Sequence, residues 1–273
     1  MDIIAPSAQL DSLWKRGRDF LGTEYAILAG AMTWVSERNL VSALSNGGGF
    51  GVIACGAMTP ELLTAEIAAT KALTDKPFGV NLITMHPELE TLIDVCLEHN
   101  VGHIILAGGL LAKRLIRQGA DALVIEGAEA GGHIGPVATS VLAQEILPHI
   151  DDVPVFIAGG IARGDAIVGY LEMGASGCQL GTRFVCAEES IAHENFKKAF
   201  LRASARDAMP SVQLDPDFPV IPVRALQNDA TREFAQTQRD VIDSFRRGEL
   251  DQTAAQLKIE HYWAGALRRA VVD

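Results

Sequence analysis

The stretch ALVIEGAEAGGHIG, residues 122–135, decides the fold. Its first four residues are apolar, as in a buried strand, and Glu126 ends the apolar run. The loop that follows is rich in glycine and carries one histidine, His133. In α/β proteins the loops after parallel strands carry the chemistry, and glycines let the main chain approach a flat or phosphorylated ligand. The stretch therefore predicts an active-site loop at the carboxyl end of a buried strand.

The same order of strand, glycine-rich loop and helix is repeated along the first two thirds of the chain. We expect seven strands, at Tyr25–Met32, Phe50–Ala54, Phe78–Leu82, His103–Leu106, Ala122–Ile125, Val155–Ala158 and Gly177–Leu180. Apolar strands separated by amphipathic helices predict an α/β fold with a parallel sheet covered by helices. Their spacing favours a TIM (β/α)8 barrel, which needs eight strands. We find seven, and the weak place in the repeat is near Gly109–Leu110, where a strand runs straight into a helix.

The repeat stops after Glu188, which predicts two parts. We expect a barrel over residues 1–190, with its core at 24–190 and a leading helix before the core. Residues 191–273 are expected to form a mainly helical lid that completes the active site. Its helices are expected at Ile191–Ala205, Asp229–Arg247 and Gln252–Val272, with a proline-punctuated connector at Asp215–Val223.

The composition limits the classes of partner. The chain has 34 acidic and 23 basic residues, a net charge of -11. An acidic protein repels nucleic acid and anionic membranes, so we expect neither as a partner. No apolar run approaches the roughly 18 residues of a membrane span, and no signal-peptide core is present. We therefore expect a cytoplasmic protein that acts on a small molecule, and the sequence leaves a homodimer open.

Other patterns give no indication of a metal site or a Rossmann nucleotide site. The cysteines form no C-x-x-C pair and lie in or beside apolar segments, so we expect buried, reduced thiols. His99 and His103 have helical ligand spacing, but turn-forming residues separate them and His103 begins a strand at the stabilising face. No G-x-G-x-x-G or P-loop is present. The four cysteines are Cys55, Cys96, Cys178 and Cys186.

Two turns follow the last two strands, Gly159-Gly160 and Gly181-Thr182. Barrel loops at these positions often bind a phosphate through backbone N–H groups. The alternative is a pair of tight strand–helix turns. The order of the two turns, and the hydroxyl of Thr182, favour a phosphate site and hence a phosphorylated cofactor or substrate.

Three further side chains are candidates by position. His133 lies among small residues with little bulk to bury it, and an imidazole with a pKa near 6.5 suits proton transfer, although a lone histidine is often structural. Asn81 ends the third strand and points at the barrel mouth, with a helix cap as the alternative. Met32 ends the first strand, with core packing as the alternative.

Several of these motifs together resemble the nitronate monooxygenase (2-nitropropane dioxygenase) family. This family includes the FMN-dependent enoyl-acyl-carrier-protein reductases of the second type. The resemblance runs from about Tyr25 to the end of the chain. It rests on GAM at 30–32, FGVNL at 78–82, GADALVIEGAEAGGHIG at 119–135, AGGI at 158–161 and QLGTRF at 179–184.

The resemblance implies a TIM barrel that holds non-covalent FMN, and it assigns roles to individual residues. His133 matches the catalytic histidine of the family. The implied FMN-binding residues are Gly30, Ala31 and Met32 along the isoalloxazine ring, Asn81 and Glu126 at its polar edge or the ribityl chain, Gly159, Gly160, Gly181 and Thr182 at the phosphate, and also Gly132 and Gln179. The family usually has a further strand–helix segment at Gly109–Leu110, so the resemblance implies that one such unit is missing here, which accounts for the count of seven strands. The family also usually has a segment beyond Asp273.

Three functions follow from the resemblance. The first is the oxidation of alkyl nitronates or nitroalkanes with O2, in which His133 bonds the nitro group or acts as a base. The second is the reduction of enoyl thioesters by NAD(P)H through FMN, in which His133 polarises the thioester carbonyl or donates a proton. The third is a non-catalytic flavin-binding barrel, which the missing strand–helix unit favours.

Overall fold

The structure is a computed structural model and describes residues 8–56, 58–107, 112–220, 222–259 and 261–262. Internal contacts divide the described chain into two compact units. The first contains the residues up to Gly127 together with Val137–Ile191, and the second contains Ala128–Pro136 and the residues from Ala192 onward. The short segment 128–136 thus leaves the first unit and joins the second.

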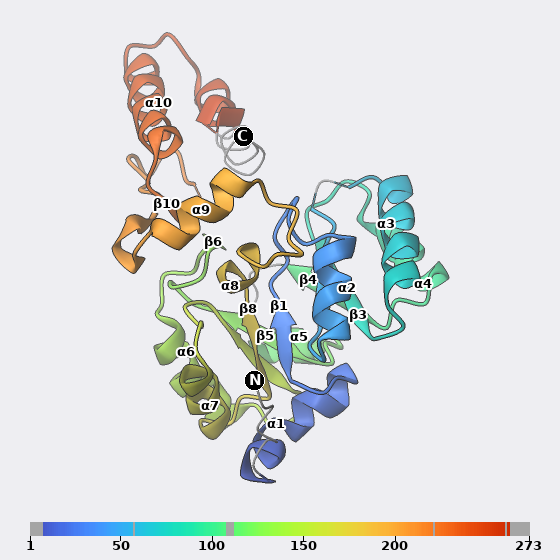
Figure 1. The fold of residues 1–273 in the computed structure, drawn as a ribbon. Coiled ribbons are helices and arrows are strands. Elements are labelled where there is room, and N and C mark those ends of the chain that lie inside the picture. The colour runs from blue at the N-terminus through green and yellow to red at the C-terminus, as the bar shows by residue number, and fades with distance from the viewer. Residues whose placement is uncertain (1–7, 57, 108–111, 221, 260, 263–273) are drawn as a thin grey trace. The chain divides into compact units, whose positions relative to one another are not determined.

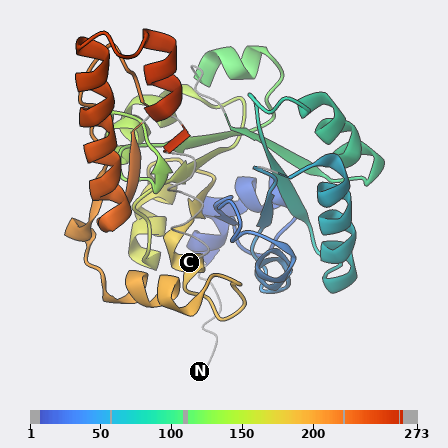
Figure 2. The ribbon, with the colours of Figure 1, turned by 90° about the horizontal axis from the view of Figure 1, so that it is seen from above.

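The first unit is built on parallel strands, seven of them within the described residues. Their hydrogen-bonded order is β5-β7-β8-β1 in one sheet and β2-β3-β4 in the other, and a bridge between Leu28 and Phe50 links the two sheets. The last strand therefore lies beside the first, as in a (β/α)8 barrel (Figure 1, Figure 2). The strands are β1 (Ile27–Ala29), β2 (Gly51–Ala54), β3 (Phe78–Ile83), β4 (His103–Ala107), β5 (Leu123–Glu126), β7 (Val155–Ala158) and β8 (Gly177–Leu180).

The series of strands is open at one position, between β4 and β5. Within the described residues no ladder joins these two strands. In register, Leu106 of β4 is the partner of Leu82, yet Leu82 is fully buried and Leu106 is 54% exposed. A missing helix and strand account for both observations, because the helix would cover Leu106 and the strand would pair with β4 and β5. The predicted junction Gly109–Leu110 itself lies outside the described residues, but the strand order confirms the α/β fold with one interrupted position.

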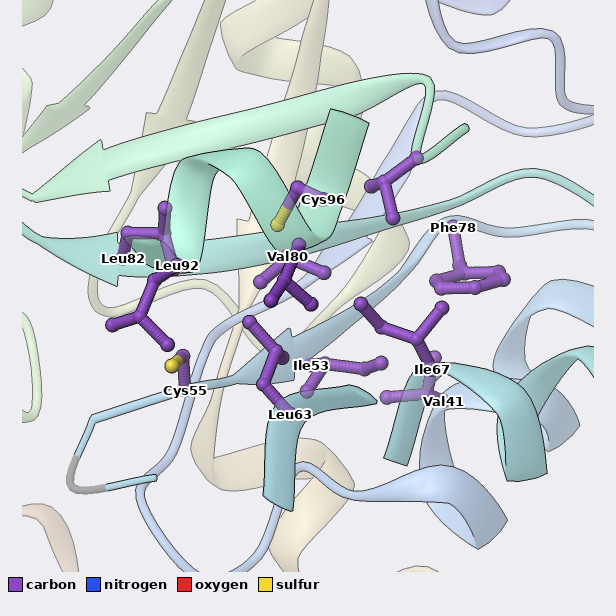
Figure 3. Packing of buried hydrophobic residues seen from close by; sticks show 12 residues of the cluster. Val41, Ile53, Cys55, Leu63, Ile67, Phe78, Val80, Leu82, Leu92 and Cys96 are labelled. Atoms are coloured by element: carbon purple, nitrogen blue, oxygen red, sulfur yellow. The ribbon is translucent and has the colours of Figure 1, made fainter. Parts of the chain in front are cut away.

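Most helices of this unit cover the outer side of the strands, whereas the first one packs against the core on their inner side. In order they are α1 (Ala8–Leu21), α2 (Arg38–Asn46), α3 (Pro60–Leu73), α4 (Leu89–Glu98), α5 (Ala112–Arg117), α6 (Thr139–Ile146), a 3-10 turn (Leu147–His149), α7 (Gly164–Glu172) and α8 (Thr182–Val185). Thr59 caps α3, with Pro60 in its first turn, as the sequence predicts. On β3, Val80 and Leu82 point outward and pack among side chains of α3 and α4 (Figure 3).

The inner side of the strands has a separate apolar core. It contains Leu28, Val52 and Phe156 from the strands, Phe50 just before β2, and Trp14 from α1. Side chains alternate between the two faces of a strand, so this core fixes which residues of each strand face inward. That alternation determines where the polar residues at the strand ends point.

The second unit combines a small sheet with helices. Antiparallel strands in the order β6-β10-β9 form the sheet. The elements are β6 (Gly132–His133), α9 (Glu194–Arg202), a 3-10 turn (Ala205–Asp207), β9 (Ala208–Pro210), β10 (Val223–Leu226), α10 (Asp229–Arg246) and a helix over 252–259. The predicted helices at 191–205 and 229–247 are present, the first of them shorter, and residues 263–272 of the third lie outside the described part. The three strands were not predicted from the sequence.

Candidate functional site

Three polar side chains lie on the inner face at the carboxyl ends of the parallel strands. Asn81 follows the inward register of β3, and Glu126 and Gln179 are both register neighbours of Ala158 through β5, β7 and β8. Side chains two positions apart on a strand point to the same face. Val124 of β5 packs in the inner core, so Glu126, two residues later, also faces inward. The strand period therefore places all three side chains on the inner face, and the ladders bring Glu126 and Gln179 to either side of Ala158.

Small residues also lie at the carboxyl ends of the parallel strands, where they leave space for a ligand. Gly30 donates its N–H to the carbonyl of Leu180 over 2.7 Å. A Cβ atom on Gly30 would lie 3.3 Å from the Cα of Gly181, so the loops after β1 and β8 touch through their main chains. Ala54 and Ala158 are buried at the ends of β2 and β7. The structure thus brings Gly30 and Gly181 together and surrounds them with little side-chain bulk.

The loop after β1 is held by a residue that the sequence did not single out. The buried Ser36 hydroxyl donates to the Gly30 carbonyl over 2.9 Å and accepts the Met32 N–H over 3.0 Å. Two residues after Ser36, Arg38 donates bonds from its backbone N–H and its guanidinium to the buried carboxylate of Glu66. Ser36 resembles an ordinary helix start in the sequence, so only the fold reveals its contact with Gly30 and Met32.

The turn after β7 needs two consecutive glycines. Gly159 and Gly160 have φ values of 98° and 70°, the left-handed region that other residues avoid. Within the described part of the chain, no backbone acceptor is found for the N–H groups of Gly159, Gly160 or Thr182. Thr182 is exposed and begins α8 directly after β8. These N–H groups follow adjacent strands and remain available to an anionic group.

Glu126 differs from ordinary surface carboxylates. Its side chain is exposed at the end of β5, yet the surrounding protein partly desolvates the carboxyl and raises its pKa above the usual 4.5. The folded state therefore binds the proton of Glu126 more tightly than the unfolded state does. As a result, the ionised Glu126 carboxylate destabilises the folded protein at pH values above the pKa of the unfolded state.

We therefore expect Glu126→Gln to raise the stability of the protein at pH 7 and to leave it unchanged near pH 4, at or below the unfolded pKa of roughly 4.3. Urea unfolding at the two pH values measures the difference. Glu145→Gln, at an exposed position on α6, is the matched control and should show no such pH dependence. A destabilised Glu126→Gln variant at pH 7 would contradict the desolvation argument.

His133 and Gly132 lie in the second unit, whereas the other nominated residues lie in the first. They form β6, where His133 is the register partner of Val223 on β10. Both residues are exposed, and Gly132 has a φ of 76° with open space where a Cβ would be. The predicted loop is therefore partly a strand, whose pairing with β10 holds the histidine.

Gly127 marks where the chain leaves the first unit, and its role is packing. A Cβ on Gly127 would lie 2.3 Å from the backbone nitrogen of Thr139, which is far too close for any side chain. Thr139 is buried at the start of α6, just after the chain returns to the first unit. Gly127 and Thr139, which flank segment 128–136, are thus packed directly against each other. This glycine is therefore required by the fold and not by a ligand.

The remaining chemical groups are structural. The cysteines form no disulfide in the described residues, and Cys55, Cys96 and Cys178 are buried as predicted, whereas Cys186 is only half-buried. Burial raises the pKa of Cys55 and Cys96 to about 11, which keeps both neutral. The His103 ring is within hydrogen-bonding distance of the Phe20 carbonyl, at 3.0 Å, and packs edge-on against Phe50.

In the described residues no cluster of three metal-ligating side chains occurs. Among the described helices, none combines the length and apolarity that a membrane span requires.

Three known proteins show what the chain is similar to. It is 32% identical to (3aS,4S,5R,7aS)-5-hydroxy-7a-methyl-1-oxo-octahydro-1H-indene-4-carboxyl-CoA dehydrogenase of Rhodococcus jostii, over 77% of this chain and only 65% of that protein. It is 24% identical to a probable nitronate monooxygenase of Staphylococcus aureus, over 93% of this chain and 92% of that one. The solved structure of FabK from Thermotoga maritima matches with a TM-score of 0.82 and 33% identity, and the match covers 94% of this chain and 84% of FabK.

The match to a family model covers most of the chain. The model described as nitronate monooxygenase matches residues 15–105 and 98–272. The two matched pieces overlap over residues 98–105, which include the start of β4, the strand after which the series is interrupted. The alignment with the Staphylococcus protein has 331 positions, more than the 273 residues of this chain, so that relative carries residues that this chain lacks. The chain belongs to the nitronate monooxygenase family.

Proposed function

We propose that this protein is an FMN-dependent oxidoreductase that oxidises alkyl nitronates or nitroalkanes with O2. One observation carries the proposal: the loops after the neighbouring strands β7 and β8 carry N–H groups for which the described residues show no backbone acceptor, and the loops after β8 and β1 are in main-chain contact. The family to which the chain belongs is flavin-dependent. A phosphorylated, flat cofactor matches such a surface in charge and in shape.

The residues present fit FMN. Gly159, Gly160, Gly181 and Thr182 would hold the phosphate through their N–H groups, since no cationic side chain is needed for that contact. Gly30, Ala31 and Met32 would lie along the ring, because a larger residue than Gly30 would meet Gly181. Asn81, Glu126 and Gln179 on the inner face would bond the polar edge and the ribityl chain. Among the described residues, Asn81 is seen to bond only through its amide nitrogen, to the Ile105 carbonyl, so its amide oxygen could accept a bond from the ligand.

The protein's own contribution to the reaction is orientation and proton transfer. Bound FMN would supply the redox chemistry that turns a nitronate and O2 into a carbonyl compound and nitrite. His133 would donate a hydrogen bond to the nitro oxygens of the substrate or take a proton from the carbon of a neutral nitroalkane. Its exposure on β6 leaves the imidazole accessible to a small molecule.

Cofactor content is the first test. The purified protein should be yellow and release FMN on denaturation. After removal of the flavin it should bind FMN far more tightly than riboflavin, which lacks the phosphate. Equal affinity for the two would argue against the predicted phosphate site, and a colourless protein that cannot be reconstituted would support a non-catalytic barrel.

Substrate assays separate the two enzymatic functions. Saturable O2 uptake with propionate-3-nitronate or 2-nitropropane, together with nitrite release, would support the proposed function. The second candidate is a flavin reaction on a thioester, favoured by the relative that is named for a carboxyl-CoA compound. It predicts saturable oxidation of NADH or NADPH with crotonyl thioester and little nitronate turnover. A homodimer and a cytoplasmic location stay predictions, which size-exclusion chromatography and fractionation test.

A further inference from the structure

Arg224 is the central residue of the sheet that carries His133. It lies on β10, where its register partners are Gly132 of β6 on one side and Pro210 of β9 on the other. The guanidinium donates through Nε and Nη2 to the carbonyl of Ala128, over 3.1 and 2.9 Å. Nη1 donates to the carbonyl of Ala208 over 2.5 Å. One half-buried side chain thus joins the main chain of segment 128–136 to β9.

These bonds bracket the histidine. Ala128 is the first residue of the segment that crosses to the second unit, and it lies five positions before His133. On the other side of His133, the Ile134 N–H donates to the Pro222 carbonyl over 3.0 Å. Among the described residues, Arg224 is the only side chain seen to bond the Ala128 carbonyl, at the start of segment 128–136. The ladder to β10 holds the same segment at Gly132 and His133.

The chemistry of the bonds explains why an arginine stands here. Its planar fork presents donors in fixed directions, so it can reach two carbonyls on different segments at once. In the described part of the chain Arg224 forms no ion pair, so its charge is directed entirely at main-chain oxygens. A lysine has one donor group on a flexible stem and cannot reproduce both contacts.

We propose that Arg224 is a positioning residue that sets where the His133 imidazole is presented. The part of the inference that concerns turnover rests on the proposed function, in which His133 is the catalytic residue. The anchoring of segment 128–136 by Arg224 is independent of the substrate.

A double-mutant cycle with Arg224→Lys and His133→Ala tests the link to turnover. Arg224→Lys should lower kcat by at least about 10-fold with a much smaller change in KM, because the substrate still binds while the proton-transfer group is misplaced. In the His133→Ala background the same substitution should change kcat by less than about twofold. Arg239→Ala, at an exposed arginine bonded to Gln236 on its own helix, is the control and should leave kcat unchanged. Losses that multiply in the double variant would overturn the proposal.

Hydrogen exchange supplies a readout that needs no substrate. In Arg224→Lys and Arg224→Ala, the peptide spanning residues 128–136 should exchange faster, while α10 keeps its wild-type protection. If that peptide is unaffected, the anchoring role is wrong. If it exchanges faster but the wild-type protein turns over neither nitronates nor thioesters, then the proposed function fails and the anchoring stands.

Discussion

Replacing His133 with alanine is expected to lower turnover by at least about 10²-fold, the usual contribution of a general acid or base. The variant should still bind FMN, because the groups nominated for the phosphate are main-chain N–H groups on the loops after β7 and β8, which the substitution does not remove. Steady-state kinetics with the preferred substrate, together with the flavin absorbance of the purified variant, measures the two effects separately.

A second histidine provides the comparison. His149→Ala removes an exposed imidazole from the 3-10 turn after α6, outside the second unit, and should retain wild-type kinetics. A near-normal kcat in His133→Ala would exclude His133 from the mechanism. Loss of flavin from that variant would show instead that the histidine acts in cofactor binding.

The second large effect is expected on stability, from Gly127→Ala. The added Cβ would meet the backbone nitrogen of Thr139 at 2.3 Å, its Cα at 2.5 Å and its Oγ1 at 2.5 Å. Backbone atoms cannot rotate away as a side chain can, so the end of β5 and the start of α6 must move apart. We expect the free energy of unfolding to fall by about 3 kcal/mol, at the upper end of overpacking costs. Urea and thermal unfolding followed by circular dichroism measure the change.

The first unit contains a matched control for this substitution. Gly169 lies inside α7, and nothing stands within 4 Å of the position where its Cβ would be. Gly169→Ala should therefore be neutral or stabilise the protein by roughly 0.5–1 kcal/mol, since alanine favours the helix over glycine. If the two alanine variants had equal stability, the contact between Gly127 and Thr139 would not be a constraint on the fold.

Local signals in the sequence were sufficient for most strands of the first unit, although the first was predicted at Tyr25–Met32 and β1 covers only Ile27–Ala29. Val155–Ala158 and Gly177–Leu180 coincide with β7 and β8, because short apolar runs that end at glycines encode a buried strand and its turn without reference to the rest of the chain. The count of seven parallel strands and the interrupted position followed from the same pattern. The period of two along a strand also determined that Asn81 and Glu126 share the inner face.

Only the tertiary structure decided which unit carries the histidine. The strand β6 has two residues, too few for any periodic signal, and it exists because β10, some 90 positions later, pairs with it. The bond between Arg224 and Ala128 joins residues 96 positions apart. Likewise, Ser36 resembles a helix start until the fold places its hydroxyl between Gly30 and Met32. Propensity and periodicity act over a few residues, whereas the partners of these groups are brought to them by the folding of the whole chain.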